Sequence, residues 1–154
     1  MAPGPTPLIR DARAALERAQ REFERGRLRE AIELLEQALV FEPDHVPART
    51  MLATAYARTR RVEPALEHLE KAVALAPEAF GPRCVLGELF LRLGVPEQAR
   101  DHLAHALELA SNAEERDYVQ RLLKEDRARE KRRAPRPSFR QPIWLFQRRR
   151  RGDA

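Results

Sequence analysis

Apolar and small residues recur along most of this chain with the spacing of one helix face. Ala65, Leu69 and Ala72 lie four and three positions apart, which places them on one side of an α-helix. The same periodicity continues upstream and downstream between short turn signals. It predicts seven helices, which cover approximately residues 8–25, 28–42, 45–59, 62–76, 79–93, 96–110 and 112–133.

This pattern repeats every 34 residues without a gap. Small residues recur in both helices of each two-helix unit, and leucines recur in the second helix. We expect the small residues to let the paired helices approach closely, and the leucines to fill the space between units. The aligned positions are Ala19, Ala53 and Gly87; Ala31, Ala65 and Ala99; Leu35, Leu69 and Leu103; Ala38, Ala72 and Ala106; Leu52 and Leu86; and Tyr56 and Phe90.

Turn-forming residues separate the helices at matching positions. Gly26 and Gly94 occupy the turn within the first and third units, and Arg60 holds the corresponding place in the middle unit. Pro43 and Pro77 are expected to stop the second helices, because proline cannot continue a helix.

A further helix is expected after the third unit. Ser111-Asn112-Ala113-Glu114 has the form of a capping box, which starts a helix. The helix that follows, to about Arg133, carries an apolar side and charges elsewhere, so it resembles the solubilising helix that closes a repeat array. Its apolar residues are Tyr118, Val119, Leu122 and Leu123.

The 34-residue units resemble the tetratricopeptide repeat family over about residues 12–111. The first unit departs from the family pattern at Arg18, where leucine is usual, and at Glu22, where tyrosine is usual. An end repeat has one neighbour only and tolerates such polar residues. The resemblance implies an all-α fold, a right-handed α-solenoid of helix-turn-helix repeats with a closing helix. The expected domains are a disordered lead (1–7), a repeat domain (8–133, with repeats at about 12–45, 46–79 and 80–113 and a capping helix at 112–133) and a flexible basic tail (134–154).

The resemblance also implies where a partner binds. In such arrays the first helix of each unit lines a concave groove that commonly holds a peptide or helix from another protein. The groove positions here are mostly apolar or neutral, which suits an amphipathic helix or extended peptide bound with micromolar affinity. They are Leu16, Gln20, Phe23, Thr50, Thr54, Ala57, Arg58, Cys84, Glu88, Leu91 and Arg92.

One partner class is not expected. Chaperone-binding members of the family hold a C-terminal carboxylate with a clamp of lysine, asparagine and arginine. The corresponding places in this chain hold Leu16, Gln20, Thr54, Gly81 and Val85. Without that clamp, binding of a chaperone tail is not predicted.

Charge is divided unevenly along the chain. The net charge is +5, but residues 1–130 hold 20 basic and 23 acidic residues, whereas residues 131–154 hold nine basic residues and one acidic residue. The body is therefore mildly acidic, and the basic character of the whole does not mark the body as a nucleic-acid binder. No stretch is apolar enough to span a membrane, and the start lacks the apolar core of a signal peptide, so we expect a cytoplasmic protein.

The sequence contains no catalytic motif for phosphate binding, nucleophilic hydrolysis or zinc hydrolysis. We therefore predict that the protein is not an enzyme and has no cofactor, metal or small-molecule substrate. His102 and His105 are three positions apart, as two metal ligands could be, but no third ligand has a matching spacing, so we interpret both as solvent-facing. Cys84 is the single cysteine and is interpreted as a small, partly buried residue.

The C-terminal tail joins an apolar run to four arginines. Tryptophan and phenylalanine are typical binding anchors, and burying side chains of this size contributes roughly 1.5–3 kcal/mol each. Five interpretations stay open: a motif that docks on another protein, a segment that folds back on the repeats, contact with an anionic membrane surface, contact with nucleic acid, and an inert extension. The contact residues would be Ile143, Trp144, Leu145, Phe146, Arg148, Arg149, Arg150 and Arg151.

Together these patterns predict a non-catalytic adaptor or scaffold. A protein partner, as a peptide or amphipathic helix, would bind in the groove, and the tail would supply a second contact. The alternative is a peripheral tether, in which the aromatic and arginine-rich tail makes a weak contact with anionic membrane or nucleic acid while the repeats hold a client protein.

Overall fold

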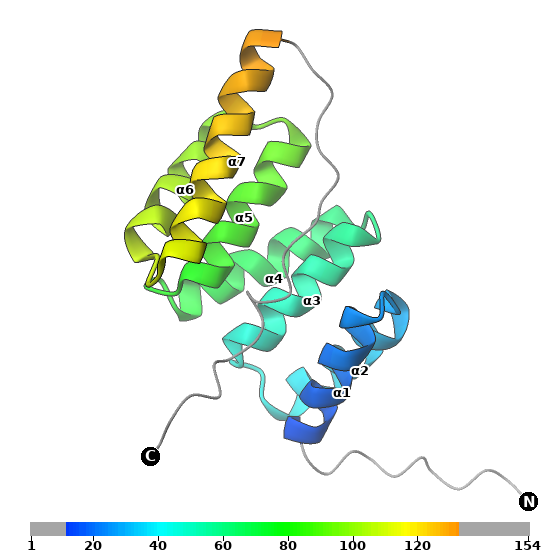
Figure 1. Cartoon of the computed structure of the whole chain (residues 1–154). Helices are drawn as coiled ribbons and strands as arrows, with labels where there is room; N and C mark the ends of the chain where they lie inside the picture. Colours follow the sequence, from blue (N-terminus) through cyan, green and yellow to red (C-terminus); the bar gives the residue numbers. More distant parts are fainter. Residues whose placement is uncertain (1–11, 133–154) are drawn as a thin grey trace, which may run out of the picture.

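The computed structural model describes residues 12–132, and within this range the chain forms seven α-helices and no strand (Figure 1). The predicted lead and almost all of the predicted tail lie outside the described residues. Every predicted helix is confirmed, and apart from the start of the first one, each end lies within one residue of its expected position. The helices are α1 (Ala12–Glu24), α2 (Leu28–Phe41), α3 (Val46–Arg58), α4 (Val62–Leu75), α5 (Phe80–Leu93), α6 (Pro96–Leu109) and α7 (Ala113–Arg132).

The turns within the three units share one backbone conformation. Gly26, Arg60 and Gly94 have φ angles of 76°, 63° and 75°, in the left-handed region that glycine adopts easily and other residues rarely adopt. The prediction that Arg60 takes the place of a glycine is therefore confirmed. Between units, α2 and α4 each end two residues before a proline, Pro43 and Pro77, as expected.

Each unit is a hairpin of two closely packed helices: α1 with α2, α3 with α4, and α5 with α6 (Figure 1). The approach is closest in the third unit, where Gly87 faces α6. A Cβ atom added to Gly87 would lie 2.7 Å from Cγ of Leu103 and 3.2 Å from the carbonyl oxygen of Ala99. Alanine fits at the equivalent positions Ala19 and Ala53, which are fully buried, so only α5 requires glycine here.

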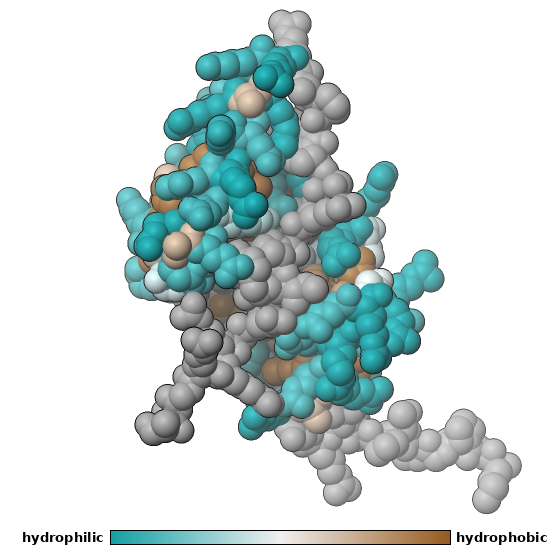
Figure 2. All heavy atoms as spheres, viewed as in Figure 1, coloured by the Kyte–Doolittle hydropathy of each residue, from teal (hydrophilic) through white to brown (hydrophobic). Residues whose placement is uncertain are grey.

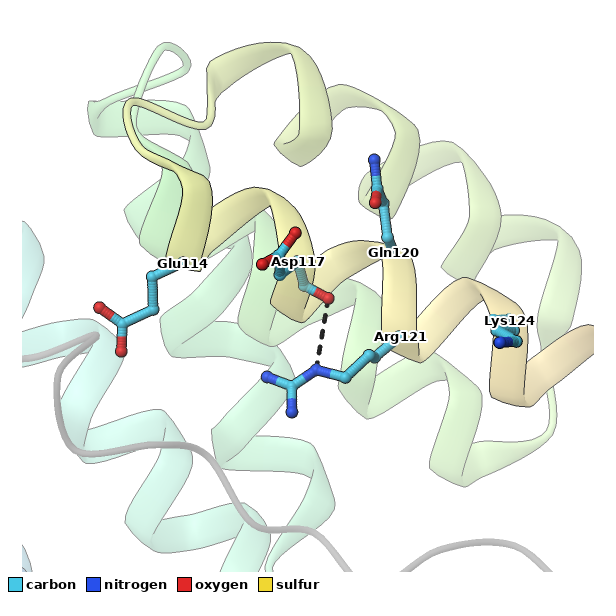
Figure 3. A pocket seen from close by; sticks show the side chains of 5 residues that line it. All are labelled: Glu114, Asp117, Gln120, Arg121 and Lys124. Carbon is cyan, nitrogen blue, oxygen red and sulfur yellow. Dashed lines mark hydrogen bonds between the residues drawn. The ribbon is translucent and has the colours of Figure 1, made fainter.

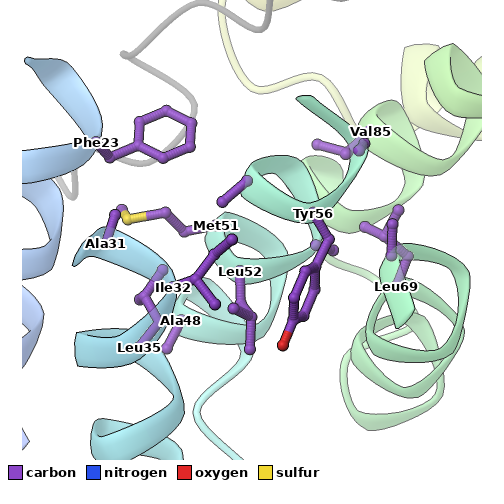
Figure 4. Close-up of a cluster of buried hydrophobic side chains, with 14 of the residues drawn as sticks. Phe23, Ala31, Ile32, Leu35, Ala48, Met51, Leu52, Tyr56, Leu69 and Val85 are labelled. Atoms are coloured by element: carbon purple, nitrogen blue, oxygen red, sulfur yellow. The ribbon is translucent and has the colours of Figure 1, made fainter. Parts of the chain in front are cut away.

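Apolar side chains from successive units form a continuous core. Figure 4 shows Ile32 and Leu35 of α2 facing Leu52 of α3, with Tyr56 and Leu69 further along the array. The three leucines at the 34-residue period, Leu35, Leu69 and Leu103, have no exposed surface. Burial of this core stabilises the array through the hydrophobic effect, and each unit depends on its neighbour for it.

The start of α7 corrects one detail of the sequence analysis. The backbone N–H of Glu115 donates to Oδ1 of Asn112 at 2.8 Å, and the Glu115 carboxylate accepts from the backbone N–H of Ser111 at 2.7 Å. The predicted pair of Ser111 and Glu114 is therefore wrong by one residue. Asparagine caps a helix as well as serine does, so the sequence allowed either register.

The closing helix packs on the third unit as predicted. Val119 is fully buried, and Tyr118, Leu122 and Leu123 pack around it against α5 and α6. Outside this apolar strip, Arg100 of α6 pairs with Asp126 at 2.9 Å and with Glu130 at 2.8 Å. The same arginine thus joins α6 to the second half of α7.

Hydrophilic residues cover most of the described surface visible in Figure 2, with apolar colour showing mainly between the helices. Four large apolar residues of the described range are exposed: Val40, Phe41, Leu75 and Val95. Among the helices between residues 12 and 132, none is long and apolar enough to span a membrane.

Candidate partner-binding surface

The residues predicted to line the groove lie on the first helix of each unit. Thr50, Thr54 and Ala57 share one face of α3, because they are four and three positions apart. Cys84, Glu88 and Leu91 repeat this spacing on α5, 34 residues later. The two helices therefore carry equivalent rows. We call the eleven positions given by the sequence analysis the predicted groove.

A cation–π contact links the groove residues of the first two units. The guanidinium carbon of Arg58 on α3 lies 5.1 Å from the ring centroid of Phe23 on α1, within the range of such contacts. Phe23 is buried and Arg58 is exposed. On the same helix, Gln20 donates to Glu24 at 3.1 Å, and the half-buried Leu16 packs against the core.

The threonines of α3 turn their hydroxyl groups back to their own helix. Oγ1 of Thr50 donates to the carbonyl oxygen of Val46, and Oγ1 of Thr54 donates to that of Thr50, both at 2.9 Å. Because the hydroxyl groups are satisfied within the helix, each threonine has its methyl group left for apolar contacts. Together with Ala57, the row on α3 is chemically close to an apolar surface.

The row on α5 combines apolar residues with one carboxylate. Cys84 has no exposed surface, and burial, followed by the nearby charge of Glu88, raises the pKa of its thiol well above its ordinary value. Glu88 is 5% exposed and accepts a hydrogen bond from the hydroxyl of Tyr118 at 2.8 Å. Partial burial lowers the pKa of Arg92, and Glu88 opposes that shift.

The predicted groove is more enclosed than the sequence analysis expected. Its rows on α3 and α5 are buried, as is Phe23; Leu16, Gln20 and Arg92 are half-buried, and only Arg58 is exposed. All ten residues from Ala48 to Ala57 are buried, so α3 is covered on every side of the helix and not only where it meets the core.

Tyr118 is a contact of the groove that sequence reasoning missed. It lies on α7, thirty positions after Glu88, and its hydrogen bond brings the closing helix to the row on α5. Burial and the Glu88 carboxylate both raise the pKa of Tyr118, so the phenol stays protonated and keeps donating. The sequence identified Tyr118 as apolar packing only, because nothing in the period of 34 residues relates α7 to α5.

The interpretation of His102 as solvent-facing is wrong, whereas His105 is exposed as expected. His102 is half-buried, stacks on Phe90 with ring centroids 5.6 Å apart, and its Nδ1 is buried without a hydrogen-bond partner among the described residues. His68 stacks on Tyr56 in the same way at 5.8 Å. Burial is the main cause that lowers the pKa of both histidines. Both are therefore packing residues at equivalent positions of two repeats.

A shallow hollow lies along one side of α7 (Figure 3). Its lining residues are spaced as one strip of the helix, with carboxylates nearer the start and basic groups further along, and Nε of Arg121 donates to the carbonyl oxygen of Asp117 at 3.4 Å. On the helix this strip borders Tyr118, so its acidic end lies next to the predicted groove. The lining residues are Glu114, Asp117, Gln120, Arg121 and Lys124.

Within the described part of the chain, no three histidine, cysteine or carboxylate side chains gather as metal ligands would. The predicted tail contacts, Ile143 to Phe146 and Arg148 to Arg151, lie outside the described residues.

The fold defines the class of protein: an α-solenoid of three helical hairpins closed by a seventh helix. The sequence model described as tetratricopeptide repeat matches residues 22–79. No curated protein sequence matches the chain. This chain therefore belongs to the tetratricopeptide repeat family: the family match covers its first two repeats, and the structure continues the same fold through the third.

Solved structures with the same fold include tetratricopeptide domains of several proteins. The first repeat domain of Spaghetti (RPAP3), solved bound to the HSP90 peptide SRMEEVD, is 23% identical, with a TM-score of 0.65, covering 74% of this chain and 91% of that one. The first repeat domain of human RPAP3 is 24% identical, with a TM-score of 0.69 and coverages of 80% and 97%. The P58(IPK) domain is 24% identical, with a TM-score of 0.69, covering 80% of this chain but only 34% of that one.

Proposed function

We propose that this protein is a non-catalytic adaptor that binds a peptide or amphipathic helix of another protein along the predicted groove, with the C-terminal tail as a second contact. The observation that carries the proposal is the repetition of one row of side chains, spaced four and three, on equivalent faces of α3 and α5. Repeated rows along an array provide a surface that matches an extended or helical segment.

The chemistry of the rows selects the class of client. Thr50, Thr54 and Ala57 offer methyl groups, and Cys84 and Leu91 add apolar surface. Arg58 and Arg92 lie at the ends of the rows and supply positive charge. A client with an apolar stripe and an acidic residue at its end fits this lining.

The family resemblance extends to a structure with a bound HSP90 peptide, but the client proposed here is of another kind. The positions of the carboxylate clamp hold Leu16, Gln20, Thr54, Gly81 and Val85. None of these side chains carries a positive charge, so a terminal carboxylate would be desolvated there without an ionic partner. We therefore expect an internal segment of the client to bind.

A matched pair of variants tests the groove. Arg58→Glu reverses a charge at the groove, and Arg29→Glu makes the same change on α2, at an exposed residue outside it. Partners would be recovered by affinity purification with the wild-type protein, purified, and measured against both variants by titration. We expect Arg58→Glu to weaken binding several-fold and Arg29→Glu to leave it unchanged. Equal binding to all three proteins would contradict the proposal.

The second candidate function is the peripheral tether. It is favoured by the separation of charge, because the segment 131–154 carries nine basic residues and one acidic residue beside an apolar run. About 1 kcal/mol per basic residue is available at an anionic membrane surface. Flotation with anionic liposomes, comparing the wild type with Arg148–Arg151 replaced by glutamine, distinguishes the two functions. Retention that depends on the arginines supports the tether, and no retention of either protein rejects its membrane form.

A further inference from the structure

We propose that the apolar segment Ile143–Phe146 docks on the predicted groove of its own chain and competes there with the client. This inference rests on the adaptor function proposed above and adds a means of regulating the same surface. It joins two features that the adaptor function alone leaves unexplained: a groove whose rows are already buried, and an apolar run that follows the repeats.

The segment can reach the groove from the end of α7. Tyr118 contacts Glu88 of the groove, and α7 ends fourteen residues later at Arg132, which places its end about 21 Å further along at a rise of 1.5 Å per residue. Residues 133–142 include three prolines, which favour an extended chain. Ten such residues span about 31 Å. The connection is therefore long enough for Ile143 to return to Glu88 while α7 stays in place.

The lining of the groove is complementary to the segment. The methyl groups of Thr50 and Thr54, with Ala57, Cys84 and Leu91, form an apolar surface with satisfied polar groups. Isoleucine, tryptophan, leucine and phenylalanine gain most from burial on such a surface. The two rows are almost fully buried in the chain as a whole, which is the state expected of a groove with an occupant.

Charge favours the same placement. The segment is followed by four arginines, whereas residues 1–130 carry a net charge of −3, from 20 basic and 23 acidic residues. The acidic end of the strip along α7, with Glu114 and Asp117, borders Tyr118 and hence the groove (Figure 3). These exposed carboxylates give the arginines a complementary site beside the docked segment.

Docking within one chain has a predictable consequence for the client. A segment on a short connection acts at an effective concentration on the order of millimolar. A free client of micromolar affinity then binds with its affinity reduced by the fraction of molecules whose groove is open. Loss of the anchor residues should therefore strengthen client binding.

Two single residues make the docking measurable in the full-length protein. Cys84 is the only cysteine and lies in the groove, and Trp144 is the only tryptophan and lies in the segment. We would compare the rate at which an aromatic disulfide reagent modifies Cys84 in the wild type, in the double variant Trp144→Ala with Phe146→Ala, and in the control Phe41→Ala, an exposed phenylalanine of α2. We expect the double variant to react about tenfold faster, the ratio typical of losing one buried anchor, and the control to react like the wild type. Equal rates in all three proteins would overturn the proposal.

Fluorescence of Trp144 provides a second readout in the unmodified chain. We expect a blue-shifted emission that acrylamide quenches weakly. Thr54→Arg, which fills the groove, should shift the emission to the red, whereas Ala104→Arg on the exposed side of α6 should not. Circular dichroism identifies any variant that fails to fold. A solvent-like emission in the wild type, or a blue shift that needs anionic vesicles, would also overturn the proposal.

Client titration separates this inference from the function on which it rests. If Arg58→Glu weakens client binding but the tail variant binds no more tightly than the wild type, the adaptor stands and the docking is wrong. If Arg58→Glu leaves client binding unchanged, the groove is not the client site, and the adaptor function fails even where the fluorescence of Trp144 is blue-shifted.

Discussion

Two glycines of one helix provide a direct test of how the third unit is packed. Gly81 and Gly87 both lie in α5, and replacing either with alanine adds one methyl group. At Gly81 the added Cβ meets no atom within 4 Å, whereas at Gly87 it would lie 2.7 Å from Cγ of Leu103 and 2.9 Å from Cδ2. The two variants therefore share their chemistry and differ only in the space available.

The expected stabilities follow from two opposing effects. Alanine is favoured over glycine in a helix by about 0.8–1 kcal/mol, and this gain applies to both variants. At Gly87 the added methyl also overpacks the core, which typically costs about 1–3 kcal/mol. The branch point of Leu103 cannot rotate away, because the side chain is fully buried. Gly81→Ala should thus be neutral to about 1 kcal/mol more stable than the wild type, and Gly87→Ala neutral to about 2 kcal/mol less stable.

Urea unfolding followed by circular dichroism measures both variants against the wild type. The informative quantity is the difference between the two, about 1–3 kcal/mol, because the helix preference of alanine cancels. If the two variants unfold at the same urea concentration, α5 and α6 do not approach as closely as described, and the argument that only glycine fits at this position is refuted.

Three further predictions follow from buried or strained residues. His68 and His102 have lowered pKa values, so the unfolded chain takes up protons near pH 6.5 that the folded chain does not; the free energy of unfolding should fall as the pH is lowered from about 7 to 5, and glutamine at both positions should reduce that slope in urea titrations. Tyr118→Phe removes a hydrogen bond to the Glu88 carboxylate and should cost about 1.5–3 kcal/mol by the same assay; a loss below about 0.5 kcal/mol would show that the bond contributes little. Arg60→Gly relieves a left-handed backbone and should stabilise the array by up to about 1 kcal/mol; a lower melting temperature would contradict this.

Local sequence patterns were sufficient for the helices and their order. The period of 34 residues located seven helices, and even Arg60 in a glycine position could be predicted, because each of these features depends on residues close together in the chain. The register of the cap at α7 was wrong by one residue because Asn112 and Ser111 are both good caps, and the local sequence does not choose between them.

The candidate site was predicted less completely. The rows on α3 and α5 follow from the repeat, but their burial and the contact from Tyr118 do not. The stacking of His68 on Tyr56 and of His102 on Phe90 had a signal in the sequence, since both pairs are twelve positions apart and related by the period. The isolated comparison of His102 with His105 obscured it.

The sequence by itself determined that this protein is a repeat array: its helices, turns and small crossing residues are set by spacing along the chain. Tertiary structure alone decided which side chains meet across helices. It placed Tyr118 against Glu88, Arg58 over Phe23, and α5 so close to α6 that Gly87 has no room for a methyl group. The physical reason is that periodicity fixes which face of a helix is buried, whereas the distance and rotation between two packed helices depend on how all of their side chains fit together.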